Sequence, residues 1–143
     1  MEKSGKKTKL IIVLELTIAS LFVIGARWTN QSVYLLYQCY FADIALPFSF
    51  YFLLSMPPNE KRFFNRWWKK ALAVFALCSA SETLQFFGIY ALAQTFDPWD
   101  FLMYAFGVSG AALVDKKIFS KVFSFWSENL PRNEEPQQAQ IAD

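Results

Sequence analysis

Hydrophobic residues are gathered into four long runs, and short segments rich in charged residues separate these runs. The runs occupy residues 10–26, 33–56, 71–93 and 98–114. The charged segments occupy residues 2–9, 60–70, 115–121 and 128–135. A predominantly apolar run of about 17–25 residues is long enough to cross a bilayer as a helix. The pattern therefore predicts an all-α, polytopic membrane helix bundle with four transmembrane helices in one domain, residues 1–127.

The first apolar run begins directly after a segment that contains four lysines. This arrangement is typical of a first transmembrane span and also of a cleaved signal peptide. Glu15 inside the run and Ile24 near its end fit a signal peptide poorly. The sequence therefore favours a retained span over a cleaved leader.

Aromatic residues and lysines are mixed after the fourth run. Phe119, Phe123 and Trp126 recur at the spacing of one helix face, with three lysines among or just before them. A basic helix with such a face lies in the plane of a membrane interface. We therefore expect a cytoplasmic interfacial amphipathic helix over residues 116–126. Residues 128–143 are polar and contain two prolines and a glutamine-rich stretch, which predicts a disordered cytoplasmic tail.

Positive charge is distributed unevenly between the two sides that the four spans define. Residues 2–9, 59–70 and 115–121 hold nearly all the lysines and arginines, whereas the opposite side holds only Arg27. Segments rich in lysine and arginine remain in the cytoplasm. The sequence therefore predicts a multi-pass protein of the cytoplasmic membrane with both termini in the cytoplasm.

Residues 59–70 interleave five cations with four aromatic rings. Such a mixture can stack on single-stranded nucleic acid. Between two spans it is more typical of an interfacial segment, in which the rings lie at headgroup level and the cations face anionic lipid. Because the net charge is only +2, we favour lipid contact and expect no nucleic-acid partner.

Several kinds of chemistry are excluded by what the sequence lacks. It has no histidine, no phosphate-binding loop and no glycine-rich dinucleotide motif. Cys39 and Cys78 cannot complete a closed zinc site without carboxylate ligands. Their positions in the spans also place them about 10 Å apart along the membrane normal, beyond the reach of a disulfide. We therefore expect no metal ion, no cofactor and no disulfide.

Five polar residues lie within the apolar runs toward the outer side: Asp43, Glu82, Gln85, Asp100 and Tyr104. Counted from the outer ends of their spans, Asp43 and Glu82 lie about 15 and 16 Å deep, near the middle of the membrane. Ionisable residues at that depth are costly and usually belong to ligand or ion sites. The sequence therefore predicts an outward-facing intramembrane pocket lined by these five residues, with Arg27 at its rim.

Each of these residues also has a purely structural interpretation. Asp43 and Glu82 could hydrogen-bond within the bundle, and Gln85 could join neighbouring helices. Asp97, placed before a proline, is typical of a turn or a helix cap. The remaining members could serve as a cap, a packing residue and a marker of the membrane edge: Asp100, Tyr104 and Arg27.

Two short motifs resemble those of the VanZ-like proteins, a family of small multi-span membrane proteins. The motifs are Glu82-x-x-Gln85 in the third run and Phe96-Asp97-Pro98-x-Asp100, leading into Tyr104 and Gly107, in the fourth. The chain differs from that pattern in having no arginine between Gln85 and Asp97, and in having Tyr104 where many such proteins have asparagine. The resemblance implies a bacterial inner-membrane protein with a role in the cell envelope.

The pocket and the resemblance together favour a protein that binds or modifies an amphiphilic envelope molecule, such as a membrane lipid or a lipid-linked precursor. A second hypothesis is a non-enzymatic accessory subunit whose intramembrane carboxylates pair with a partner protein or with a second copy of the chain. A third, weaker hypothesis is a proton- or ion-coupled transporter. The residues do not decide whether the protein is an enzyme, since paired carboxylates serve both binding and acid–base chemistry.

Overall fold

The computed structural model describes residues 2–25, 31–56, 64, 66–89 and 96–126. Within these residues the chain is helical and contains no strand, which confirms the all-α prediction. Four long helices follow one another, α1 (Glu2–Gly25), α2 (Gln31–Leu53), α3 (Trp67–Phe86) and α4 (Pro98–Leu113). A π-helix, η1 (Val114–Phe119), and a short helix, α5 (Ser120–Val122), continue directly from α4.

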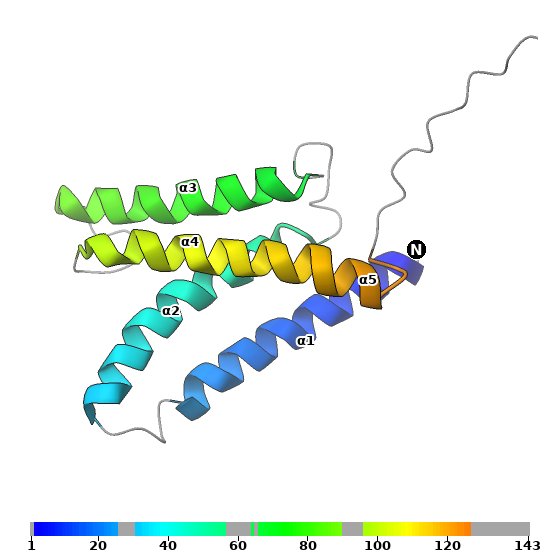
Figure 1. Cartoon of the computed structure of the whole chain (residues 1–143), viewed down its shortest axis with the longest axis horizontal. Helices are drawn as coiled ribbons and strands as arrows, with labels where there is room; N and C mark the ends of the chain where they lie inside the picture. The colour runs from blue at the N-terminus through cyan, green and yellow to red at the C-terminus, as the bar shows by residue number, and fades with distance from the viewer. Residues whose placement is uncertain (1, 26–30, 57–63, 65, 90–95, 127–143) are drawn as a thin grey trace, which may run out of the picture.

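The four helices form two hairpins (Figure 1). Helices α3 and α4 lie side by side and antiparallel, while α1 and α2 diverge as a V below them, and α2 crosses α4. The amino terminus, the start of α3 and α5 lie at one end of the molecule, here called the terminal end. The opposite end, where α3 finishes and α4 begins, is here called the turn end. Both ends of the described chain therefore lie on the same side of the bundle.

Helices α2 and α4 approach each other most closely at Gly107. A Cβ atom there would overlap the backbone carbonyl of Ile44 and lie 2.7 Å from Cγ of Pro47. Pro47 lies inside α2 and is fully buried. Only a residue without a side chain allows two helix backbones to meet at this separation. Gly107 is thus required where α2 crosses α4.

The turn end is formed by strong stop and start signals. Gly88 has a φ of 77°, and the N–H groups of Gly88 and Ile89 donate to the carbonyls of Gln85 and Leu84. This pair of bonds is a Schellman motif, which ends a helix at a glycine in the left-handed conformation. Helix α3 therefore ends at Phe86. Residues 90–93, the last part of the predicted third span, lie outside the described residues.

Helix α4 begins with a side-chain cap. Oδ1 of Asp97 accepts a hydrogen bond from the backbone N–H of Trp99 at 3.0 Å, and Pro98 occupies the first helical position. Aspartate at the cap and proline at the first position are both favourable at a helix start. The structural interpretation of Asp97 as a helix cap is confirmed.

The separate interfacial helix predicted over residues 116–126 is not formed. The chain continues from α4 through η1 and ends its helical course at Val122. Phe119 and Trp126 are 8% and 5% exposed and pack on Phe52 of α2, with ring centroids 5.3 and 6.1 Å away. These aromatic rings are buried in the core because it offers them closer contacts than a flat interface would. The predicted tail, residues 128–143, lies outside the described residues.

Helix α1 is attached more loosely than the others. Tyr37 of α2 donates to the carbonyl of Leu21 at 3.0 Å, and Phe22 stacks on Phe41 at 6.1 Å. Most of its large apolar side chains are exposed: Ile12, Val13, Leu16, Leu21, Val23 and Ile24. Among the described residues, Lys3–Gly25 is the one helical stretch long and apolar enough to cross a membrane, and Tyr40–Leu53 is a shorter apolar one. A single such helix also occurs in signal sequences, so this criterion alone does not establish four spans.

Candidate functional site at the turn end

Glu82 is the central residue of the turn end. It lies on α3, one turn before the helix ends, and its side chain is fully buried. Oε1 accepts a hydrogen bond from the backbone N–H of Asp97 at 2.7 Å, and Oε2 accepts one from the hydroxyl of Tyr104 at 3.3 Å. Glu82 therefore joins the end of α3 to both the N-cap residue and the second turn of α4.

A second pair of carboxyl groups lies beside Glu82. The carboxyl groups of Asp43, on α2, and Asp100, in the first turn of α4, lie close enough to interact electrostatically. Two bare carboxylates have no hydrogen-bond donor between them and repel each other. Asp43 also lies within electrostatic reach of Glu82 and Asp97. The turn end thus concentrates four acids from three helices and the turn.

Gln85 lies one helical turn beyond Glu82 on the same face of α3. It is buried, and its Oε1 has no hydrogen-bond partner among the described residues. The hydroxyl of Ser81, also buried, likewise has no partner within that part of the chain. A buried polar atom that lacks a partner costs about 1–3 kcal/mol, so each such atom calls for an explanation. Two such atoms next to Glu82 on α3 therefore have hydrogen-bonding capacity that the described residues do not use.

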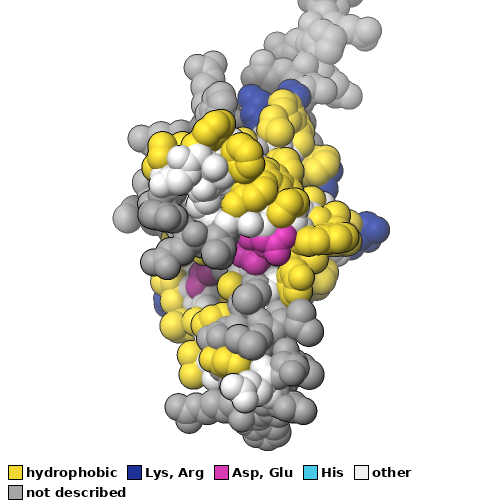
Figure 2. Space-filling view, turned by 90° about the vertical axis from the view of Figure 1, so that its left-hand side faces the viewer, with side chains coloured by type: hydrophobic (Ala, Val, Ile, Leu, Met, Phe, Trp, Pro, Cys, Tyr) yellow, Lys and Arg dark blue, Asp and Glu magenta, His cyan; other side chains and the backbone are white. Residues whose placement is uncertain are grey.

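Three of the four acids of the turn end are partly exposed at the surface of the molecule (Figure 2). Viewed from this end, the molecule shows acidic side chains in the middle of a largely hydrophobic face. The partly exposed acids here are Asp43, Asp97 and Asp100, whereas Glu82 lies behind them and is buried. No ion pair joins any of these carboxyls to a lysine or arginine within the described part of the chain.

The structure brings together most of the residues that the sequence places in the pocket. Asp43 contacts Asp100, Glu82 contacts Tyr104, and Gln85 lies one turn from Glu82. Arg27 lies outside the described residues. The predicted depth of Glu82 is counted from residue 93, which lies outside the described residues, whereas helix α3 ends at Phe86. Glu82 therefore lies about one turn from the end of its helix.

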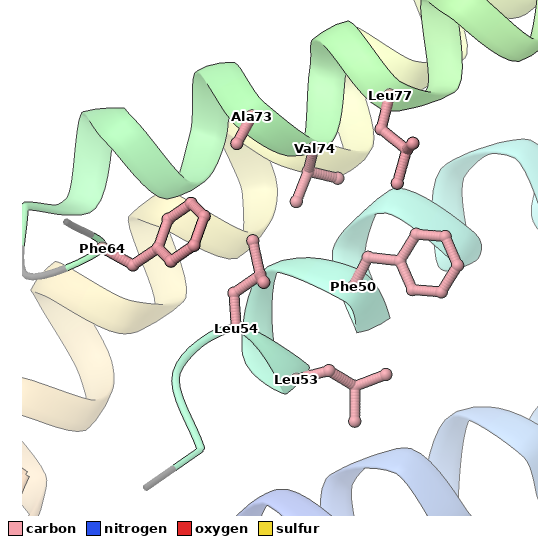
Figure 3. Close-up of a pocket in the computed structure, with 7 residues that line it drawn as sticks. All are labelled: Phe50, Leu53, Leu54, Phe64, Ala73, Val74 and Leu77. Carbon is pink, nitrogen blue, oxygen red and sulfur yellow. The ribbon is translucent and has the colours of Figure 1, made fainter. Parts of the chain in front are cut away.

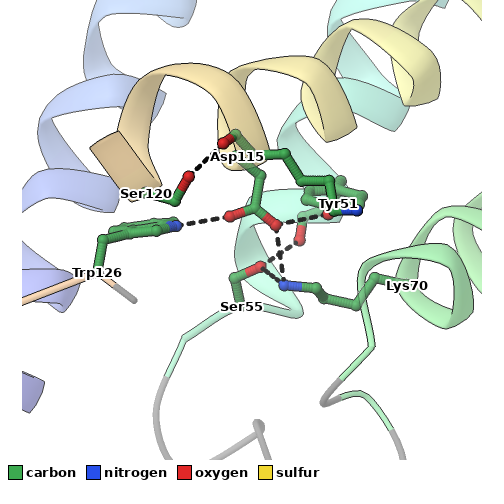
Figure 4. A network of polar contacts seen from close by, with 7 residues as sticks. Tyr51, Ser55, Lys70, Asp115, Ser120 and Trp126 are labelled. Atoms are coloured by element: carbon green, nitrogen blue, oxygen red, sulfur yellow. Dashed lines mark hydrogen bonds and ion pairs between the residues drawn. The ribbon is translucent and has the colours of Figure 1, made fainter. Parts of the chain in front are cut away.

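A second polar network, at the terminal end, is centred on Asp115 (Figure 4). Its Oδ2 accepts from the hydroxyl of Tyr51 at 2.6 Å and pairs with Nζ of Lys70 at 3.3 Å. Its Oδ1 accepts from Nε1 of Trp126 at 2.6 Å. Lys70 also donates to Oγ of Ser55 at 2.8 Å. All five of these residues are buried, so α2, α3, η1 and the segment after α5 are joined by one saturated network.

The sequence interpretation missed this network. Lys70 and Asp115 lie in the charged segments that flank the apolar runs, where lysines are expected to face lipid and water. The structure instead starts α3 at Trp67 and turns Lys70 inward, with Nζ 5.0 Å from the centroid of the Tyr51 ring. The one feature of the sequence that could have indicated the network is Asp115, an acid that immediately follows an apolar run and precedes two lysines.

The described residues contain no group of three or more metal-binding side chains that could hold a metal ion. Cys78 is a free thiol and is buried. The arrangement at the turn end therefore offers carboxyl groups, a phenol and an amide, which bind hydrogen-bond donors and cations. No family of known proteins, no curated protein and no solved structure matches this chain.

Proposed function

We propose that this protein crosses the inner membrane four times, with both termini in the cytoplasm, and binds an amphiphilic cell-envelope molecule at its turn end. The first three helices have 24, 23 and 20 residues, and each is about 30 Å long or more, the thickness of a bilayer's hydrocarbon core. Exposed large apolar side chains are spread over all four long helices. Water does not accept so much apolar surface readily, whereas lipid does.

The charges at the two ends support the same orientation. Lysines gather at the terminal end, at the start of α1 and around η1. Acids gather at the turn end. Positive segments are retained in the cytoplasm, which places the terminal end inside and the acidic turn end outside. The lengths and the charges thus agree on one arrangement.

Buried Glu82, with the unpartnered Gln85 beside it, is the observation that carries the binding proposal. A carboxyl kept out of water is stable only when its partners are supplied. Here the protein supplies one N–H and one hydroxyl, the latter at 3.3 Å. Among the described residues, none donates to the Gln85 oxygen. A bound head group that donates hydrogen bonds would supply the missing partner of Gln85 and a further one for Glu82.

The sign of the charge narrows the class of ligand. Four acids without a basic partner among the described residues disfavour a phosphate group at this position. They favour a head group with amines or hydroxyls, while the ligand's hydrocarbon part lies against the apolar surface of the helices. The resemblance of the Glu82-x-x-Gln85 and Phe96-Asp97-Pro98-x-Asp100 motifs to VanZ-like proteins supports an envelope ligand in this place.

An accessory role in a membrane complex is the second candidate function. The observation that favours it is α1, whose apolar side chains are mostly exposed and could pack on a partner helix or a second copy of the chain. A stoichiometric membrane protein that remains bound after mild extraction, with no retained lipid-like molecule, would support this role instead.

Mass spectrometry of the gently extracted full-length protein tests the binding proposal. We expect a bound amphiphile in the wild type, and its loss in Glu82→Gln and Asp43→Asn, which preserve shape and remove a charge. Glu15→Gln is the matched control, because it removes a carboxyl from α1, away from the turn end. Retention of the ligand in Glu82→Gln, or its equal loss in Glu15→Gln, would contradict the proposed site.

Cysteine labelling from either side of sealed vesicles tests the arrangement in the membrane. Single cysteines at Lys3 and Lys121 should react only from the cytoplasmic side, and one at Trp99 only from outside. Intact mass should show that residues 1–26 are retained. Labelling of Lys121→Cys from the outside would overturn the four-span arrangement.

A further inference from the structure

An apolar groove lies between α2 and α3 in the half of the bundle nearest the terminal end (Figure 3). Its volume is about 320 Å³. Phe50, Leu53 and Leu54 line it from α2, and Ala73, Val74 and Leu77 line it from α3. Phe64, just before α3, closes its end, and every lining side chain is hydrophobic. None of these residues belongs to the turn-end site or to the Asp115 network.

Cations lie along the same face of α3 as the groove. Arg66, Lys69, Ala73 and Leu77 follow one another at spacings of three or four residues, so they form one stripe along the helix. Arg66 is exposed, lies two residues from Phe64, and is the N-cap residue of α3 without supplying a side-chain cap. The first N–H groups of a helix are favourable partners for a phosphate. Positive charge is therefore placed at the groove's terminal end.

The dimensions fit one leaflet of a bilayer. Arg66 and Leu77 are eleven residues apart, which is about 16 Å along the helix and close to half of a roughly 30 Å hydrocarbon core. Trp67 and Trp68, both exposed, lie at the level of Arg66. Tryptophan rings are enriched at the headgroup level. The stripe thus passes from a headgroup zone into an acyl-chain zone within the length of one leaflet.

We propose that this groove binds one anionic phospholipid of the cytoplasmic leaflet. An acyl chain lies between α2 and α3, and the phosphate lies at the amino end of α3 beside Arg66 and Lys69. Charge complementarity selects the occupant, since these cations favour an anionic headgroup over a zwitterionic one, while the lining is entirely apolar. The site differs from the turn-end site in location, in leaflet and in the charge of its ligand.

Native mass spectrometry of the full chain, with phosphatidylglycerol or phosphatidylcholine of identical acyl chains added, tests this proposal. We expect a one-lipid adduct that favours phosphatidylglycerol by about thirtyfold, since each of the two cations contributes roughly 1 kcal/mol toward an anionic lipid. Arg66→Gln combined with Lys69→Gln should remove the preference and leave the weaker adduct common to both lipids. Equal binding of the two lipids by the wild type would overturn the proposal.

A matched pair of alanines tests the groove itself. Ala73→Phe fills the groove and should abolish the adduct, whereas Ala76→Phe, on an exposed position of the same helix, should not. Leu77→Trp, at the more exposed edge of the groove, serves as a second obstruction if Ala73→Phe lowers the helical content. Lipid adducts unchanged in both groove variants would overturn the assignment. A dimer abolished by Ala73→Phe, with adducts unchanged, would assign the groove to a second copy of the chain.

Discussion

The two carboxylate clusters of this protein differ in how completely their hydrogen-bond partners are supplied. At the terminal end, both oxygens of Asp115 are occupied, by a phenol, an ammonium and an indole N–H. At the turn end, Glu82 accepts from one backbone N–H and one hydroxyl, and Asp97 accepts from the N–H of Trp99. The Gln85 oxygen there has no partner among the described residues. Both clusters join several helices, so connectivity does not distinguish them.

Saturation is what distinguishes the clusters. A buried network with every partner present makes the structure rigid and leaves nothing for a ligand to bind. A cluster with more acceptors than donors is less stable alone, and a ligand that donates hydrogen bonds stabilises it. The comparison therefore assigns stability to the Asp115 network and binding to the turn end.

Replacing one carboxylate in each cluster by the isosteric amide should give the largest difference in stability between the two clusters. Asp115→Asn removes the charge opposite Lys70 and turns an N–H₂ group toward other donors, so we expect a loss of about 3–5 kcal/mol in the free energy of unfolding. Glu82→Gln keeps an acceptor for the Asp97 N–H and should cost less than about 1.5 kcal/mol. Denaturant unfolding in detergent, followed by circular dichroism, measures both.

A double replacement is the control for Asp115. Lys70→Met together with Asp115→Leu removes both charges and should recover a large part of the stability lost in Asp115→Asn. Failure of the double variant to recover would indicate that the hydrogen bonds from Tyr51 and Trp126, not the ion pair, dominate the network. Equal losses in Asp115→Asn and Glu82→Gln would remove the basis of the comparison.

Two glycines of α4 test whether the region between the clusters depends on backbone contact. Gly107→Ala places a Cβ against the carbonyl of Ile44 and should destabilise the protein by about 1–3 kcal/mol. At Gly110 a Cβ would make only ordinary contact with Phe48 at 3.8 Å, so Gly110→Ala should be neutral or gain up to about 1 kcal/mol from helix propensity. Thermal unfolding of the two variants under one condition gives the difference directly, and a harmless Gly107→Ala would contradict the close crossing of α2 and α4.

The two tyrosines bound to carboxylates give the smallest and most direct contrast. Tyr51→Phe removes a 2.6 Å bond to Asp115 and should cost about 1.5–3 kcal/mol, as for a bond to a charged group. Tyr104→Phe removes a 3.3 Å bond to Glu82 and should cost about 1 kcal/mol or less. Both variants keep the ring, so packing is the same in each. A larger loss at Tyr104 would show that the turn end is the more tightly bonded cluster.

The sequence pattern predicted the helices better than their ends. Apolar runs between charged segments predicted four helices, because the length of each run and the spacing of its apolar residues indicate a helix in water and in lipid alike. The end of α3 was missed, since the stop at Gly88 depends on two backbone hydrogen bonds that apolar composition does not reveal. Phe119 and Trp126 were placed at a membrane surface because helical spacing alone does not say which surface an aromatic face will contact.

The candidate site was predictable in membership and not in geometry. Asp43, Glu82, Asp100 and Tyr104 stood out because acids and phenols are unusual in apolar runs. Their pairing could not be derived, since it depends on the crossing of α2 and α4 at Gly107. The Asp115 network escaped prediction for the opposite reason, because a lysine beside aromatic residues at the end of a span is ordinary in sequence and its burial is decided by tertiary packing.

The π-helix after α4 depends on the number of residues in this segment, independently of which residues they are. Bonding from residue i to i+5 accommodates one more residue per turn than an α-helix does. In η1 the N–H of Ser120 bonds to the carbonyl of Asp115, five residues earlier. Lys117 is exposed and can be exchanged for many residues. Its deletion would rotate everything that follows by about 100° and separate Phe119 and Trp126 from their partners. This segment should therefore tolerate replacement of Lys117 while the number of residues between Asp115 and Phe119 is conserved.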